Sequence, residues 1–173
     1  MPFTPFHFGP GFFIKSIASK WFSFRVFILT NIITDLEPLY YILHNQWPAH
    51  RFFHTYLGAT FIAMICAVIA NPIFYSMALV WNILFKNFKV EKVNIPKVTL
   101  IISALIGTYS HVFLDSFMHR DMIPWYPVSE YNSLLERLGF IEIHFLCVLL
   151  GIAGLGIYLL VIVYKRVRGA LVG

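Results

Sequence analysis

Long apolar runs separated by short polar segments dominate the sequence. Tyr56 to Phe85 has no charged residue, Val98 to Tyr109 is mostly apolar, and Phe145 to Tyr164 is an apolar run that ends at a basic tail. A helix needs about 20 mostly apolar residues to cross a bilayer, so we predict three transmembrane helices. The first is longer than a bilayer core at about 1.5 Å per residue, and we expect it to tilt or to kink at Asn71-Pro72.

The first third of the chain is less regular. The spacing of serine and lysine residues within Gly11 to Phe24 predicts a helix with one polar stripe, lying at the interface or forming a hairpin. Arg25 to Thr34 is a further apolar stretch, and we expect a break near Asp35 because Pro38 cannot continue a regular helix. The predicted fold is all-α: one membrane-embedded domain, residues 1–173, with an N-terminal helical hairpin and four to five membrane segments.

The composition agrees with a membrane protein. Hydrophobic residues make up 59% of the chain, charged residues 12%, and the mean hydropathy is +0.75. Soluble domains have about 25% charged residues, so this chain has too little charge to cover a surface that faces water. Disordered proteins, nucleic-acid-binding proteins and secreted disulfide scaffolds are therefore excluded. Cys66 and Cys147 lie in apolar runs, which indicates two small buried side chains and no disulfide.

The charges fall into two groups along this topology. Ten of the 13 basic residues lie in three clusters, at 15–25, 86–97 and 165–168. The positive-inside rule places these clusters, and the C-terminus, in the cytoplasm. The opposite side receives residues 35–55 and 110–144, with seven of the eight acidic residues. All seven histidines also lie there if the N-terminus folds back.

Two pairs of residues and one acidic segment stand out on that side. His50 and His54 are four residues apart before the long span, and His111 and Asp115 are four residues apart at the end of the next. In a helix each pair shares one face, and antiparallel neighbours bring both pairs to one depth. Asp35, followed by Glu37, lies at the expected break. Imidazole and carboxylate groups suit zinc, so the sequence predicts a metal site here.

His7 joins this group if residues 11–24 and 25–35 form an antiparallel hairpin, which returns the chain to its start and places His7 beside Asp35. A metal ion would also offset the cost of carboxylates in apolar segments, which is roughly 2.5–3.5 kcal/mol each. We interpret His44 and His119 as loop residues. Glu142 and His144 face different sides of a helix, so at most one is a ligand. The aromatic segment 122–131 predicts an interfacial belt or a lid.

Four segments together resemble a known family. Over about residues 1–120 the chain is similar to the small bacterial inner-membrane proteins described as metal-dependent hydrolases. The segments that carry the similarity are MPFTPFHFGPG, TDLEP, HRFFHT and SHVFLD. That family is grouped with zinc-dependent phospholipase C and single-strand nucleases. The resemblance implies a bacterial inner membrane, a site on the periplasmic side, and metal ligands at His7, Asp35, His54, His111 and Asp115.

The chain departs from the family pattern P-D-x-D-H in three places. Thr34, Glu37 and Pro38 replace the proline, the second aspartate and the histidine. HRFFHT is also one residue shorter than the family's H-R-G-x-T-H-S, which shifts the register of His50. We therefore expect one or two zinc ions, and we expect His7 and His50 to support a second ion or to orient the leaving group.

These observations lead to one functional hypothesis and two alternatives. We expect a zinc-dependent hydrolase that acts on a phosphoester of a lipid or lipid-linked substrate through metal-activated water. In this hypothesis Asp35 and its partners hold the metal, Glu37 is the general base, and Arg51 and Arg120 bind phosphate oxygens. Membrane lipids are the expected partners, and nucleic acid is not expected. The alternatives are an ion-coupled transporter and a non-catalytic membrane protein with a structural metal.

Overall fold

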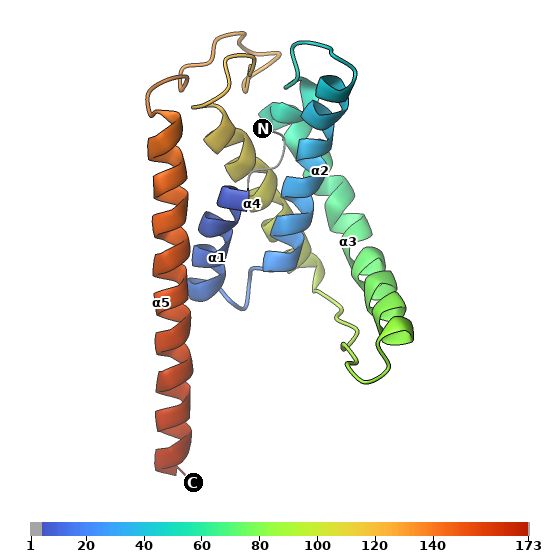
Figure 1. Cartoon of the computed structure of the whole chain (residues 1–173), viewed down its shortest axis with the longest axis vertical. Helices are drawn as coiled ribbons and strands as arrows, with labels where there is room; N and C mark the ends of the chain where they lie inside the picture. The colour runs from blue at the N-terminus through green and yellow to red at the C-terminus, as the bar shows by residue number, and fades with distance from the viewer. Residues whose placement is uncertain (1–4, 173) are drawn as a thin grey trace.

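The computed structural model describes residues 5–172, with side chains up to residue 168, and each regular element in this part of the chain is a helix. The all-α prediction is confirmed. Two short 3₁₀ helices and five α-helices follow in the order η1 (Pro5–His7), α1 (Phe8–Ile17), α2 (Phe24–Leu43), η2 (Phe52–His54), α3 (Tyr56–Leu84), α4 (Lys97–Asp115) and α5 (Phe140–Val172) (Figure 1).

Four of these helices, α2 to α5, are long and apolar enough to cross a membrane. The three spans predicted from the apolar runs are therefore present, and α2 is a fourth. Thr55 begins α3 as its N-cap residue, because its hydroxyl oxygen accepts a hydrogen bond from the backbone N–H of Gly58 at 2.9 Å. The chain thus has the helices of a multi-pass membrane protein.

The predicted break near Asp35 is wrong, because α2 continues through Pro38 to Leu43. Helix α3 also continues through Pro72. A proline removes one backbone hydrogen bond from a helix. If the helix ended inside a membrane, several more backbone N–H and C=O groups would be unpaired in hydrocarbon. The continuous helix therefore has the lower free energy.

The first helix differs from its predicted bounds of residues 11–24. It begins at Phe8 and ends at Ile17, and a turn follows over residues 18–23. Lys15 holds this turn, because its ammonium group donates to the carbonyl oxygens of Ser19 at 2.7 Å and Phe22 at 2.9 Å. These carbonyl groups lie after the helix end, so Lys15 stabilises the turn that follows α1.

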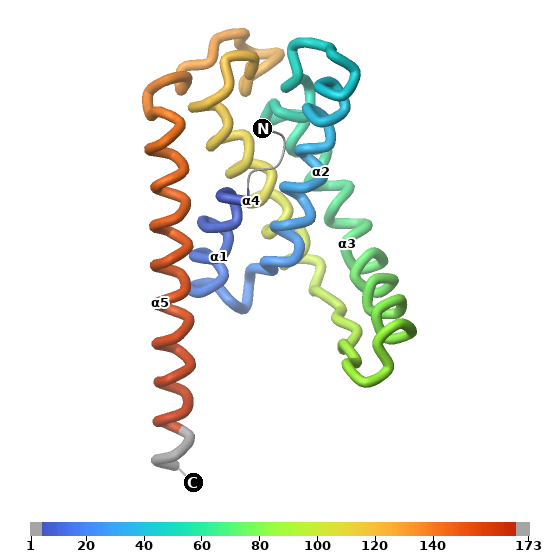
Figure 2. Tube along the Cα trace, in the orientation of Figure 1, coloured from blue at the N-terminus to red at the C-terminus, as the bar shows by residue number. Residues whose placement is uncertain are grey.

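Helices α2, α3 and α4 pack against one another, whereas α1 packs chiefly against α5, beside which it lies in Figure 2, and only secondarily against α2. Gly9 allows this close approach, since a Cβ atom there would lie 2.0 Å from the carbonyl oxygen of Cys147 in α5. The expected hairpin of α1 and α2 is therefore present, but its first helix belongs mainly to an α1–α5 pair. That arrangement sets the position of His7, just before α1.

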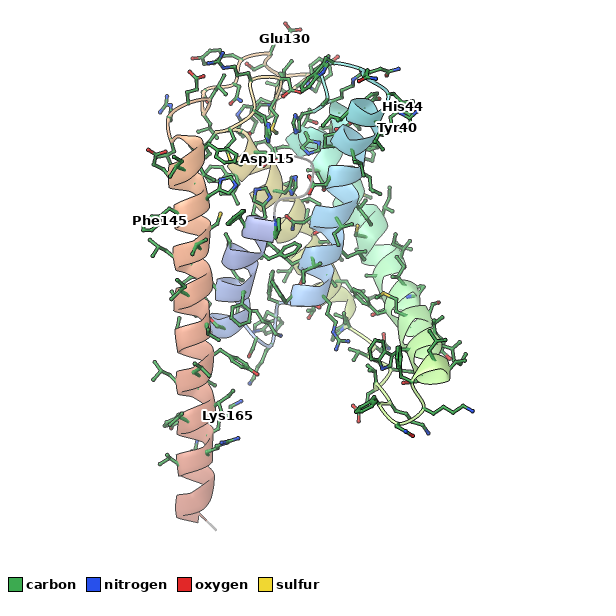
Figure 3. All side chains as sticks on the ribbon, in the orientation of Figure 1. Tyr40, His44, Asp115, Glu130, Phe145 and Lys165 are labelled. Carbon is green, nitrogen blue, oxygen red and sulfur yellow. The ribbon has the colours of Figure 1, made fainter. Side chains whose placement is uncertain are left out.

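Side chains of α2, α3 and α4 form the largest buried cluster, which includes Val26, Ile62, Cys66, Leu100 and Ala104. Cys66 and Cys147 are buried free thiols, as predicted. The histidine-rich end of α4 and the basic end of α5 lie at opposite ends of the molecule. Figure 3 shows this, with Asp115 near one end and Lys165 near the other.

Asn71 ties the segment before α4 to α3. Its amide nitrogen donates to the carbonyl oxygen of Ile95 and its amide oxygen accepts from the Ile95 N–H, both at 2.9 Å. We expect Asn71→Leu to lower the free energy of unfolding in detergent by about 1–3 kcal/mol, because both Ile95 groups lose their partners. Asn87→Leu, in the exposed loop after α3, is the control. An equal loss of unfolding free energy in both variants would contradict a stabilising role for the Asn71–Ile95 hydrogen bonds.

Candidate metal centre

Five of the six predicted metal ligands, all except His50, come from four separate elements that meet at one end of the helix bundle. The start of the chain contributes His7 from η1, α2 contributes Asp35, and η2 contributes His54. His111 and Asp115 lie in the last two turns of α4. All five residues are buried. Figure 3 shows Asp115 in this region, between the upper parts of α4 and α2.

Four of these residues are close enough to share one ion. One ligand atom from each of Asp35, His54, His111 and Asp115 lies within 4.8 Å of the others. His111 Nε2 lies 3.3 Å from Asp35 Oδ1 and 3.2 Å from Asp115 Oδ2. Ligands at zinc distances of about 2.0–2.2 Å in a tetrahedron are roughly 3.3 Å apart. The two distances from His111 therefore match those between neighbouring ligands of a tetrahedral site.

Hydrogen bonds on the far side of each imidazole fix which nitrogen faces the centre. Asn31 donates its amide nitrogen to Phe27, so its amide oxygen accepts from His111 Nδ1 at 2.9 Å. The Nδ1 of His54 donates to Glu37 Oε2 at 2.9 Å. Both Nε2 atoms then carry a lone pair toward the carboxylates. A metal cation placed between them would accept these lone pairs and would offset the negative charge of the carboxylates.

The centre also contains buried polar atoms that no hydrogen bond satisfies within the described part of the chain. These are the Nε2 atoms of His7, His54 and His111 and the Oδ1 atom of Asp115. Leaving one such group unpaired costs about 1–3 kcal/mol, so four together need an explanation. A divalent cation held by Asp35, His54, His111 and Asp115 would satisfy the Nε2 atoms of His54 and His111, and these residues fit such an ion.

A second group lies beside the first and shares Asp115. Ligand atoms of His50, Asp115 and His119 lie within 4.8 Å of one another, and the His50 and His119 rings are 4.1 Å apart at their centroids. His7 Nε2 is 3.2 Å from Asp115 Oδ1 on the same carboxylate. Asp115 is therefore placed to bridge two ions.

Asp121 orients the imidazole of His50. Its Oδ1 atom accepts from His50 Nδ1 at 2.9 Å, while its Oδ2 atom accepts from the backbone N–H groups of Ala49 and His50. Burial would raise the pKa of Asp121, but these hydrogen bonds hold it well below its usual value. Asp121 thus stays ionised and fixes His50 Nδ1 as the protonated nitrogen, as second-sphere carboxylates do in metal sites.

Two histidines outside the membrane-spanning helices, His54 and His119, are suited to bind a metal at neutral pH. Burial lowers the pKa of His54, and the neighbouring His111 and His50 lower it further, although the hydrogen bond that His54 donates to Glu37 raises it. Burial likewise lowers the pKa of His119 to about 4. Neutral imidazoles at pH 7 have the lone pair that a metal requires.

Several predicted site residues lie in positions that differ from those we expected. His50 and His54 do not share a helix, since His50 lies in a loop and α3 begins only at Tyr56. His7 contacts His111 and Asp115, at 3.2 Å each, and was expected beside Asp35. Glu37 receives hydrogen bonds from His54 and from the backbone N–H groups of Arg51 and Phe53.

The two predicted phosphate-binding arginines contact other groups. The guanidinium of Arg51 lies 3.6 Å over the ring of Tyr41, and its Nε donates to the carbonyl oxygen of Pro48. Arg120 is exposed and pairs with Glu136. Neither belongs to the two groups of metal-ligand atoms.

The sequence reasoning missed His119. It lies four residues after Asp115, just as Asp115 lies four residues after His111, and its backbone N–H donates to the Asp115 carbonyl oxygen at 3.0 Å. The turn after α4 therefore continues the helical spacing. The pattern H-x-x-x-D-x-x-x-H was the signal that would have identified it.

Comparisons with known proteins give one match. The model of a family described as "Domain of unknown function (DUF4184)" matches residues 1–170. No curated protein and no solved structure matches the chain. The resemblance to metal-dependent hydrolases thus stays a prediction, and function has to be argued from the site.

Proposed function

The chain belongs to the DUF4184 family, whose function is unknown. From the geometry of its buried histidines and carboxylates we propose that it is a membrane-embedded, metal-dependent hydrolase of phosphoesters. The observation that supports this most is the sharing of Asp115 by two groups of metal-ligand side chains. A carboxylate that bridges two ions about 3.5–4 Å apart is typical of enzymes that hydrolyse phosphate esters.

Zinc is the metal we propose, in one or two ions. The donors are imidazole nitrogens and carboxylate oxygens, a set that zinc accepts, and zinc with four such ligands would bind a water molecule or substrate by becoming five-coordinate. Asp35, His54, His111 and Asp115 would hold the first ion. His50, His119 and His7 would hold the second together with Asp115. A bound ion supplies Lewis acidity toward a phosphoryl oxygen and lowers the pKa of a water molecule to about 7.

Glu37 and Asp121 act as positioning residues in this proposal. Each accepts a hydrogen bond from the Nδ1 of one ligand histidine, at 2.9 Å, and so keeps its Nε2 directed at the metal. This replaces the general-base role that we predicted for Glu37. Arg51 would shape the site through its backbone N–H, which donates to Glu37 at 3.1 Å.

The substrate we propose is a membrane lipid or a lipid-linked phosphoester. Phe52 and Phe53, immediately before His54, are 40% and 39% exposed, and Leu57 is 45% exposed just after it. Exposed apolar side chains beside a buried polar centre favour approach from the bilayer. A lipid headgroup can then reach the centre while its acyl chains remain in hydrocarbon.

Turnover by the full-length protein in nanodiscs tests the proposal. We expect hydrolysis of bis-p-nitrophenyl phosphate or phosphatidylcholine that stops after chelation and returns with zinc. Asp35→Asn should abolish it, whereas His44→Ala, an exposed histidine outside the centre, should retain it. Bound zinc without turnover in either assay would contradict a hydrolase. Zinc flux into liposomes in that case would instead indicate a transporter.

The role of Glu37 gives a separate prediction. We expect Glu37→Gln to lower zinc affinity about 10–100-fold, because an amide holds the His54 imidazole less firmly than a carboxylate does. Competition with a fluorescent zinc chelator measures this. Glu136→Gln, which removes the same charge from an exposed residue paired with Arg120, is the control and should bind zinc normally. Unchanged affinity in Glu37→Gln would contradict the positioning role.

A further inference from the structure

A second site lies at the end of the molecule opposite the metal centre. A cavity of about 510 Å³ opens beneath the turn that joins α1 and α2, with α1, α2 and the start of α4 around it. Its lining includes Lys15, Lys20 and Arg25 from the turn and its flanks, with Asn94 and Thr99 across from them. Three cations around one cavity suit an anionic ligand.

These three cations have no acidic partner in the described part of the chain. The ion pairs there form around the metal centre and between Arg120 and Glu136. Lys15 donates to two carbonyl oxygens of the turn, which fixes its position at the cavity. Lys20 and Arg25 are exposed. The positive charge of the cavity is therefore uncompensated.

The basic side of the cavity lies nearer to the metal centre than the lower ends of α3 and α5 do. Asp35 and Asp115 lie together at the metal centre, and both helices run away from it. Arg25 is then about 15 Å from that level along α2, whereas Lys97 is about 27 Å away along α4, at about 1.5 Å per residue. Figure 1 shows the α1–α2 turn ending short of the lower ends of α3 and α5. A lipid headgroup fits such a recess better than the surface of a soluble partner protein would.

An apolar groove begins at the same arginine. Arg25 also lines a cavity of about 340 Å³ between α2 and α3, together with Ile28, Phe74, Met77 and Trp81. The guanidinium thus stands between a basic pocket on one side and an apolar groove on the other. An amphipathic molecule with an anionic head and a hydrocarbon tail matches both parts.

We propose that these two cavities together bind one anionic phospholipid. Its phosphate would contact Lys20 and Arg25, with Lys15 behind them, and one acyl chain would lie in the groove along α3. Basic pockets between transmembrane helices bind anionic headgroups by this combination of charge and depth. The site is separate from the metal centre, so it holds whether or not the chain is a hydrolase.

Trp81 in the groove is a built-in reporter. The chain has four tryptophans, and the background Trp21→Phe, Trp47→Phe, Trp125→Phe leaves only Trp81. The full-length protein in phosphatidylcholine nanodiscs is titrated with phosphatidylglycerol that carries brominated acyl chains, which quench nearby tryptophan. We expect saturable quenching at low mole fraction with brominated phosphatidylglycerol. Brominated phosphatidylcholine at the same fraction should give only the weak quenching of bulk lipid.

Charge removal separates this site from general surface attraction. Lys20→Gln with Arg25→Gln should weaken phosphatidylglycerol binding about 25-fold, at about 5-fold for each basic side chain. Lys86→Gln with Lys89→Gln removes the same charge from the exposed loop after α3 and should leave binding unchanged. Equal quenching by the two lipids, or an equal loss in both double variants, would overturn the proposal. Displacement by millimolar inorganic phosphate would overturn it too, because a free anion would then be the ligand.

Discussion

Asp115→Asn is expected to reduce zinc binding by the purified protein more than any other single change at the centre. Asp115 is shared by both groups of ligand atoms, so one substitution weakens both sites. Replacing a second-sphere residue costs 10–100-fold in affinity, and we expect the loss of this bridging ligand to exceed about 100-fold. Elemental analysis of the protein after dialysis against micromolar zinc measures it.

The control for Asp115→Asn is Glu142→Gln, which removes one negative charge from an exposed residue at the start of α5. It should retain full zinc content. Thermal unfolding in the presence of chelator checks the fold of both variants, and we expect Asp115→Asn to remain folded because two carboxylates no longer face each other in the metal-free centre. Zinc content equal to that of the unchanged protein would contradict the shared role of Asp115.

Gly9→Ala is expected to disturb the packing of α1 on α5 and, through it, the metal centre. A Cβ atom at Gly9 would lie 2.0 Å from the carbonyl oxygen and 2.9 Å from the carbonyl carbon of Cys147. Those are backbone atoms of a helix, so α1 must move away. Such overpacking costs about 1–3 kcal/mol, and it displaces His7, two residues earlier, from Asp115. We expect lower thermal stability together with weaker binding of the second zinc ion.

Gly156→Ala is the matched control for Gly9→Ala, since no heavy atom lies within 4 Å of a Cβ atom at Gly156. It should stabilise α5 slightly, because alanine favours a helix over glycine by about 1 kcal/mol, and it should leave zinc binding unchanged. Differential scanning fluorimetry and zinc titration follow both variants. Gly9→Ala with unchanged stability would show that α1 does not depend on this contact.

The apolar runs were sufficient to predict the membrane helices, because a bilayer imposes one length and one composition on any helix that crosses it. They could not predict that α2 continues through Pro38. The penalty that proline imposes in water is outweighed in a membrane, where unpaired backbone groups cost more. The rule that proline ends a helix applies in water, and it failed at Pro38 because α2 is long and apolar enough to lie in a membrane.

At the candidate site, too, the sequence predicted relations within one helix but not those that depend on how separate segments pack. The spacing of His111 and Asp115 placed them on one face of α4, since a helix fixes that relation by itself. The partnership of Glu37 with His54 was not predictable, because it depends on how a loop of Trp47 to Arg51 returns to α2. The packing of α1 on α5 was also not predicted. The small residues that permit it are Gly9, Gly151 and Gly154.

Anomalous scattering at the zinc edge, from crystals of the full-length protein grown with zinc, tests the central claim most directly. We predict a peak about 2.0–2.2 Å from the Nε2 atoms of His54 and His111 and from carboxylate oxygens of Asp35 and Asp115. A second peak on the His119 side of Asp115 would mark the other ion. A zinc-soaked crystal with no peak at this centre, or with His54 turned away from Asp115, would contradict the account.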